Sequence, residues 1–202
     1  INNWEATYFD FNEEKILSIA RQASELGIEM LVLDDGWFGS RDSDDAGLGD
    51  WFVNTDKLKG GLADLVRGIN GLGMKFGIWI EPEMVNEDSC LYREHPDWAL
   101  TIPGRKPCRS RNQLVLDMSR SDVRDYIFDS ISAVLKSTNV EYVKWDMNRS
   151  ICDIYSAALP KERQGEVYHR YVLGVYDLME RFTSTFPDIL FEGCSGGGGR
   201  FD

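Results

Sequence analysis

The sequence predicts an α/β fold, a parallel (β/α)8 barrel of the TIM type that is truncated after about six β/α units. Strand-like and helix-like segments alternate along all 202 residues without a repeat or a linker, as in a single α/β domain. Nearly every predicted strand also ends in an acidic residue. Because strand ends converge on one pocket in such a barrel, these residues predict a shared site: Asp34, Asp35, Glu81, Asp117, Asp146 and Glu192.

Short apolar runs bounded by glycine, proline or acidic residues define the predicted strands, over residues 3–9, 28–33, 75–80, 113–116, 142–146 and 189–191. Amphipathic segments predict the helices, over residues 13–26, 62–72, 121–137 and 161–186. Gly27 and Gly73 stop the first two helices, and Ser121 can cap the third. Pro82 ends the third strand, because proline cannot donate to a strand ladder.

A doubly wound parallel sheet would show the same alternation of elements. However, no glycine-rich phosphate-binding sequence follows the first predicted strand, which disfavours a nucleotide-binding sheet. The glycine run at residues 196–199 lacks the Lys-Ser/Thr pair of a phosphate loop, and it mainly lets the backbone approach a ligand closely. Because the predicted strands are fewer than a closed barrel needs, the sequence predicts a barrel that is cut before its last strands.

Composition and charge narrow the function classes. The content of 43% apolar and 12% aromatic residues is typical of a soluble globular protein. The formal net charge of −12 disfavours nucleic acid and anionic membranes as partners, and no apolar run is long enough to predict a membrane span. Four scattered cysteines without CxxC spacing predict reduced thiols in a cytoplasmic protein.

Residues 142–149 carry the densest set of candidate catalytic groups. The segment opens as a short apolar run and ends in charged and amide side chains. Lys144 and Asp146 are two residues apart, so on a strand their side chains point to the same side. Lys144 would then keep Asp146 ionised and available as a base or nucleophile. The alternative is a buried Lys–Asp pair that only fixes the end of the strand.

Paired carboxylates, aromatic side chains and few cations are typical of a glycosidase pocket. A carboxylate attacks or activates water there, while aromatic faces pack on the sugar. Five of the six tryptophans lie near predicted strand ends or in the loops after them: Trp4, Trp37, Trp51, Trp79 and Trp145. Packing in the core would explain any one of these rings, but their shared placement favours a carbohydrate site.

Two acidic pairs leave alternatives open. Asp34 and Asp35 suit hydrogen bonds from sugar hydroxyls, but one of them could instead cap the next loop. A metal site there is disfavoured because no histidine accompanies the pair, so we expect no bound metal. Glu81 and Glu83 could form a catalytic pair by themselves, or Pro82 could place them in a rigid turn whose acids position other groups.

Four sequence blocks together resemble the α-galactosidases of glycoside hydrolase family 36, in the same order and over essentially the whole chain: LDDGWF at 33–38, GIWIEPE at 77–83, KWDMNR at 144–149 and CSGGGGRFD at 194–202. The resemblance implies retaining hydrolysis of terminal α-galactosides such as melibiose and raffinose, without a cofactor, by a homo-oligomeric parent enzyme. It also implies that residues 1–202 are an incomplete catalytic barrel, with flanking β-domains absent.

The resemblance assigns roles residue by residue. Asp146 matches the catalytic nucleophile, and the substrate-binding matches are Trp4, Asp34, Asp35, Trp79, Arg111, Lys144, Asn148, Cys194 and Gly196. Arg111 precedes the fourth predicted strand, the wrong end for a barrel site unless the preceding loop folds over the top. The acid/base residue matches no position here, and we expect it in a segment beyond residue 202.

Two other functions fit the same blocks. A galactosyl transferase of the same superfamily would use a sugar instead of water to resolve the intermediate. A catalytically incomplete fragment would bind galactose without turning it over. N-acetylgalactosamine is the disfavoured substrate, because in the family the residues matching Cys194 and Gly196 crowd the position of an N-acetyl group.

Overall fold

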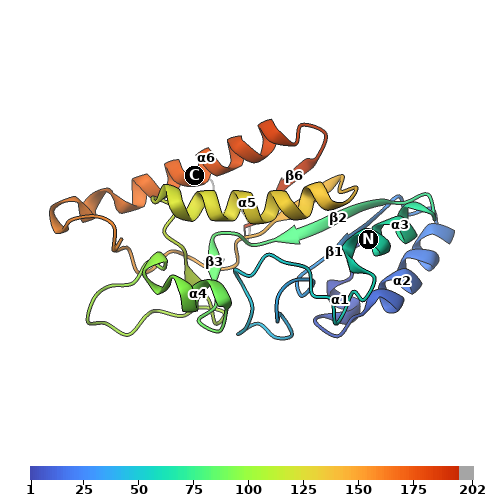
Figure 1. Cartoon of the computed structure of the whole chain (residues 1–202), viewed down its shortest axis with the longest axis horizontal. Helices are drawn as coiled ribbons and strands as arrows, with labels where there is room; N and C mark the ends of the chain where they lie inside the picture. Colours follow the sequence, from blue (N-terminus) through green and yellow to red (C-terminus); the bar gives the residue numbers. More distant parts are fainter. Residues whose placement is uncertain (196–202) are drawn as a thin grey trace.

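The computed structural model describes residues 1–195, and its centre is a four-stranded parallel sheet (Figure 1). The strands lie in the order β1-β2-β5-β6, with bounds β1 Met30–Leu33, β2 Lys75–Ile80, β5 Tyr142–Trp145 and β6 Leu190–Gly193. A separate two-stranded antiparallel ribbon joins β3, Met84–Val85, to β4, Leu114–Val115. The described chain is therefore an α/β unit built on a parallel sheet.

The helices match the predicted segments closely where the sequence is amphipathic over several turns. Their bounds are α1 Trp4–Thr7, α2 Glu13–Glu25, α3 Gly61–Asn70, α4 Cys90–Glu94, α5 Ser121–Ser137 and α6 Val167–Thr185. The long helix predicted over residues 161–186 begins as a 3-10 turn, Lys161–Glu166, and a second short 3-10 turn covers Pro96–Trp98. Helices α5 and α6 lie side by side (Figure 1).

The strands of the parallel sheet lie in the order in which they occur along the chain. All neighbouring strands are parallel, and their order follows the chain without a reversal. Because crossovers between parallel strands are right-handed, this order places the connecting helices on one face, whereas a doubly wound sheet needs a reversal. Trp145 points to the helical side, where its ring meets the Phe182 ring of α6 edge-on at 5.6 Å.

The opposite face of the sheet carries the candidate site residues in register. Val32, Gly77 and Tyr142 occupy one row, and Trp79 pairs with Lys144 in the next row toward the carboxyl edge. A Cβ on Gly77 would lie only 2.8 Å from Cδ1 of Tyr142 and 3.1 Å from Cγ2 of Val32. Glycine at this position therefore lets the Tyr142 ring lie across β2 below the site.

The strand predicted over residues 3–9 is wrong. Only Ile1 and Asn2 lie along β1, and the chain then turns into the short helix α1. The side chain of Asn2 accepts a hydrogen bond from the Trp4 main-chain N–H at 2.7 Å, and the side chain of Asn3 accepts one from Asp34 at 2.8 Å. Asparagine side chains that bond nearby backbone compete with strand formation, which is the physical reason for the turn.

The predicted strand 113–116 does not join the parallel sheet, which has four strands within the described residues. Its central pair forms β4, which is antiparallel to β3. A tight turn at Arg111 and Asn112, both with positive φ, and a bridge between Ser110 and Gln113 start this strand. Glu192 lies inside β6 rather than at its end.

No helix within residues 1–195 is long and apolar enough to cross a membrane. All four cysteines, Cys90, Cys108, Cys152 and Cys194, are free thiols.

Candidate active site

Asp146 lies at the carboxyl edge of the sheet, directly after β5, and three donors fix its carboxylate. Oδ2 accepts hydrogen bonds from the indole Nε1 of Trp79 at 3.0 Å and from Nδ2 of Asn148 at 2.8 Å. Oδ1 accepts the main-chain N–H of Met147 at 2.9 Å. Asp146 is 6% exposed. Its orientation is therefore set by Trp79 on β2 and by two residues of the segment after β5.

Lys144 forms an ion pair with Asp34, and its charge also interacts with that of Asp146. Nζ of Lys144 lies 2.9 Å from Oδ2 of Asp34, which also accepts a hydrogen bond from Asn2. Burial acts to lower the pKa of Lys144, but the hydrogen bond and the charge of Asp34 outweigh it and raise the pKa. The cation thus joins the end of β1 to β5, and amide and indole donors hold Asp146.

Asp35 is held by Arg41, which comes from the loop after β1. The guanidinium donates to both carboxylate oxygens, with Nε at 2.9 Å from Oδ1 and Nη2 at 2.8 Å from Oδ2. Arg41 also donates to the side chain of Asn86 at 2.9 Å, and all three residues are buried. Burial raises the pKa of Asp35, and the hydrogen bonds from Arg41 oppose that effect. A buried bidentate pair of this kind fixes the carboxylate geometrically.

Trp79 stands in a cluster of buried aromatic rings. Its ring stacks on Phe38 with centroids 6.1 Å apart and an interplanar angle of 6°, and Trp51 lies 6.4 Å away. Nε1 of Trp37 donates to the main-chain oxygen of Trp79 at 2.8 Å. The loop after β1 therefore locks the indole that donates to Asp146.

Trp4 lies at the rim of an open cavity of about 470 Å³ on the site face of the sheet. Lys144 lines the same cavity, together with Asn2, Val32 and Tyr142. The Trp4 ring meets the rings of Tyr8 and Phe9 edge-on at 5.2 and 5.1 Å. The structure thus brings Trp4 to the same cavity as Lys144, although residues 3–9 do not form a strand.

The turn that carries Arg111 lies on the carboxyl side of the sheet. Because β4 runs antiparallel to β3, and β3 follows the end of β2, the turn before β4 returns to that edge. The side chain of Asn86 donates to the main-chain oxygen of Asn112 at 2.8 Å, which ties this turn to the Arg41 and Asp35 group. The antiparallel pairing thus places this turn at the carboxyl edge although Arg111 precedes β4.

Cys194 follows β6, and its main-chain N–H donates to the oxygen of Trp145 at 2.8 Å. Burial raises the pKa of its thiol, and a hydrogen bond to Asp146 raises it further. Cys194 is therefore a third side chain that contacts the nucleophile candidate, beside Trp79 and Asn148. Gly196, the other predicted contact of this block, lies outside the described residues.

Glu81 is one of the acidic strand-end residues of the predicted shared site, although the family resemblance assigns it no role. It is 1% exposed, its Oε1 accepts the main-chain N–H of Asn148 at 2.6 Å, and its Oε2 accepts Nε2 of Gln113 at 2.9 Å. Burial raises its pKa to about 8, and the charges of Asp146 and Asp35 contribute to the rise. Glu83 instead accepts the indole N–H of Trp145 at 2.7 Å, so the two glutamates serve different partners. The Glu-Pro-Glu turn was the available sequence signal.

We expect the stability contribution of Glu81 to fall as the pH rises. The pKa is raised from 4.5 to about 8, so between these values the folded state keeps a proton that the unfolded state releases. The free energy of unfolding then decreases with pH by at most about 1.4 kcal/mol per pH unit. Calorimetry of the full-length enzyme and its Glu81→Gln variant from pH 5 to 8 should show the variant gaining relative stability. Parallel melting curves would contradict the raised pKa.

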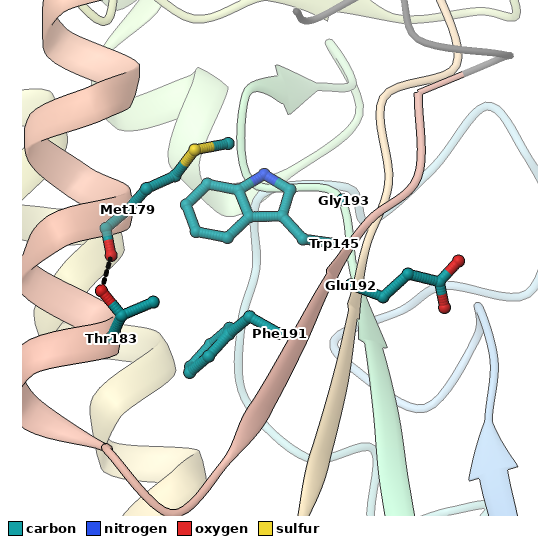
Figure 2. Close-up of a pocket in the computed structure, with 6 residues that line it drawn as sticks. All are labelled: Trp145, Met179, Thr183, Phe191, Glu192 and Gly193. Carbon is teal, nitrogen blue, oxygen red and sulfur yellow. Dashed lines mark hydrogen bonds between the residues drawn. The ribbon is translucent and has the colours of Figure 1, made fainter.

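An apolar pocket of about 140 Å³ lies on the other side of the sheet, against α6 (Figure 2). Trp145, Phe191 and Met179 line it, while the carboxylate of Glu192 points away from these rings. The pocket therefore belongs to the helical face and is separate from the carboxylates around Asp146. Within residues 1–195, no group of three or more His, Cys, Asp or Glu side chains is arranged to hold a metal ion.

Comparison with protein families shows to which family the chain belongs. The melibiase family model matches residues 1–202. The chain belongs to the melibiase family. It is 64% identical to the α-galactosidase AgaA of Geobacillus stearothermophilus and 60% identical to α-galactosidase 1 of Pediococcus pentosaceus, over 100% of this chain and 28% of each relative. The chain thus spans less than a third of these melibiase relatives.

Solved structures extend the melibiase match to the fold. The crystal structure of AgaA superimposes with a TM-score of 0.96 at 64% identity, covering 100% of this chain and 28% of that chain. The α-galactosidase of Lactobacillus brevis superimposes with a TM-score of 0.97 at 53% identity, covering 100% and 27%. An AgaA variant crystallised with raffinose gives a TM-score of 0.96 at 63% identity, covering 100% and 28%.

Proposed function

We propose that the chain is part of the catalytic (β/α)8 barrel of a homo-oligomeric, cytoplasmic, retaining α-galactosidase. The observation that carries the proposal is the Asp146 carboxylate, fixed by three donors at the carboxyl edge of a parallel sheet, in a chain of the melibiase family. Retaining glycosidases need such an oriented carboxylate beside the scissile bond. Raffinose-type oligosaccharides are the proposed substrates, in line with the raffinose complex of the relative.

In the proposed mechanism, Asp146 attacks the anomeric carbon while an acid from beyond residue 202 protonates the leaving oxygen. A galactosyl ester of Asp146 forms, and water then cleaves it with the same acid acting as base. Retention predicts a separation of about 5–5.5 Å between the two carboxyl groups. Trp79 and Asn148 aim the nucleophile, because both donate to its Oδ2.

The other residues of the site bind the galactose ring in this proposal. Asp34 and Asp35 accept hydrogen bonds from the hydroxyls at C4 and C6, with Lys144 and Arg41 holding the two carboxylates in place. Trp4, Trp79 and Arg111 contact the sugar from the wall of the pocket and the β4 turn. Cys194 lies beside the C2 hydroxyl in this proposal and leaves no room for an N-acetyl group, a role that the family resemblance also assigns to Gly196.

Aryl glycosides test the proposed function on the full-length enzyme. We expect rapid release of nitrophenol from the α-galactoside, and little from the α-glucoside or the α-N-acetylgalactosaminide. The anomeric configuration of the first sugar product, followed by NMR, should be α. Equal rates on the three sugars, or a β product, would contradict the proposal.

Asp35→Ala in the full-length enzyme should mainly weaken sugar binding. The substitution removes a carboxylate that accepts the C4 hydroxyl and leaves Arg41 buried without its partner, so we expect KM for the galactoside to rise by at least about tenfold. The preference for galactoside over glucoside should fall, because these sugars differ at C4. If the glucoside is rejected as strongly as before, Asp35 does not read that hydroxyl.

A further inference from the structure

We propose that Glu81 is a positioning residue of this site, whose carboxyl group holds both Asn148 and the Arg111 turn in their working positions. The inference rests on the proposed function, in which Asp146 is the nucleophile. Glu81 directly follows β2, so it lies between the two segments that it contacts. It does not touch the reacting atoms in this account and acts through its neighbours.

The first contact of Glu81 fixes the group that aims the nucleophile. Its Oε1 accepts the main-chain N–H of Asn148 at 2.6 Å, and the side chain of the same Asn148 donates to Asp146 at 2.8 Å. Asn148 lies in a segment without regular hydrogen-bonded structure, two residues after the nucleophile candidate. The Glu81 contact therefore decides where the amide of Asn148 points.

The second contact reaches the turn that carries Arg111. Oε2 of Glu81 accepts Nε2 of Gln113 at 2.9 Å, and Gln113 closes the turn by donating its main-chain N–H to Ser110 at 3.1 Å. Arg149 adds a hydrogen bond to the main-chain oxygen of Gln113, so the turn is tied to the Asn148 segment from both sides. One carboxyl group thus couples a nucleophile contact to a substrate-binding turn.

Glu81 can make these contacts without adding a negative charge to the site. Its neighbourhood already holds Asp146 and Asp35, both of which raise its pKa, while Arg41 is engaged by Asp35 and Arg149 by main-chain oxygens. Oε1 of Gln113 is buried and has no hydrogen-bond partner within the described residues. If the side-chain amide of Gln113 rotates, that oxygen can accept the proton of a neutral Glu81.

The same rotation predicts that glutamine can replace Glu81. In Glu81→Gln, the amide oxygen accepts the Asn148 N–H and the amide nitrogen donates to Oε1 of Gln113. Glu81→Leu has a similar size but leaves both donors buried without acceptors. The Gln and Leu variants therefore distinguish loss of the hydrogen bonds from loss of the ionisable carboxyl group.

The experiment compares these variants in the full-length enzyme, with kcat and KM for nitrophenyl α-galactoside and the rate of covalent labelling by 2-deoxy-2-fluoro-α-galactosyl fluoride. We expect Glu81→Leu to lower kcat and the labelling rate together by about 100-fold, and Glu81→Gln to stay within about threefold of the parent. Glu83→Gln is the matched control, because it changes a buried glutamate of the same turn that contacts Trp145, and we expect parental kcat.

A folded Glu81→Leu enzyme with parental kcat would overturn the inference, as would a Glu81→Gln enzyme as slow as Glu81→Leu. If Glu81→Leu does not fold, the Gln113→Leu variant provides the test, because it frees the Arg111 turn from Glu81. We then expect KM to rise by about tenfold with a smaller change in kcat. An unchanged KM overturns the inference. If the parent itself neither hydrolyses the galactoside nor becomes labelled, the proposed function fails, which is a separate outcome.

Discussion

Asp146→Asn in the full-length enzyme should lower turnover of α-galactosides by at least about 10⁴-fold while galactose binding stays measurable. The amide is a poor nucleophile, so the galactosyl ester cannot form. Asparagine has almost the same shape, and its oxygen can still accept a hydrogen bond from Trp79 or Asn148. The substitution therefore removes the chemistry and keeps most of the pocket. Initial rates and calorimetric titration with galactose measure the two effects.

Asp117→Asn is the matched control for this prediction. Asp117 is buried and follows a strand, but its carboxylate accepts hydrogen bonds from Ser119 and Ser156 and not from the donors that hold Asp146. We expect its turnover per folded molecule to stay within about threefold of the parent. Retained turnover in Asp146→Asn would move the nucleophile to another carboxylate.

Gly174→Ala should destabilise the protein by about 3 kcal/mol or more, because α6 packs against backbone at this residue. A Cβ on Gly174 would lie 1.8 Å from the main-chain oxygen of Met118 and 2.7 Å from its carbonyl carbon. Met118 cannot yield easily, since the same oxygen accepts a hydrogen bond from Arg124 at 2.8 Å. The helix would have to shift away from the segment that precedes α5.

Gly165→Ala is the control for the packing argument, because nothing lies within 4 Å of the added Cβ. We expect the melting temperature of Gly165→Ala to stay close to that of the parent, and that of Gly174→Ala to fall clearly in the same calorimetric scan. Equal melting temperatures of the two variants would show that α6 does not approach Met118 as closely as described.

The sequence predicted those elements whose pattern is local. Strand β2 and helix α5 have the predicted bounds, since an apolar strand and an amphipathic helix of several turns depend mainly on their own residues. Residues 3–9 fail because two asparagine side chains bond the backbone and start a turn. The strand that pairs with residues 113–116 could not be predicted from the sequence, because strand pairing depends on segments that are distant in the chain.

The candidate site shows the same difference between features that local sequence predicts and features that depend on distant segments. Spacing correctly placed Lys144 and Asp146 on one face of β5, but the partner of Lys144 is Asp34, which is 110 positions away in the chain. Arg41 carried no sequence signal of its own, and the Glu-Pro-Glu turn did not reveal the partners of Glu81, because both depend on burial among groups of other segments. Residue types and strand ends therefore predict which carboxylates gather, and the folded chain decides which donors hold them.

The most direct test of the central claim is mass spectrometry of the full-length enzyme after incubation with 2-deoxy-2-fluoro-α-galactosyl fluoride. Its activated leaving group needs little acid assistance, so the first chemical step depends mainly on the nucleophile. The account predicts one fluorogalactosyl adduct per active enzyme, mapped by peptide digestion to Asp146. A folded, active enzyme that carries the adduct on another carboxylate, or that forms none, would contradict it.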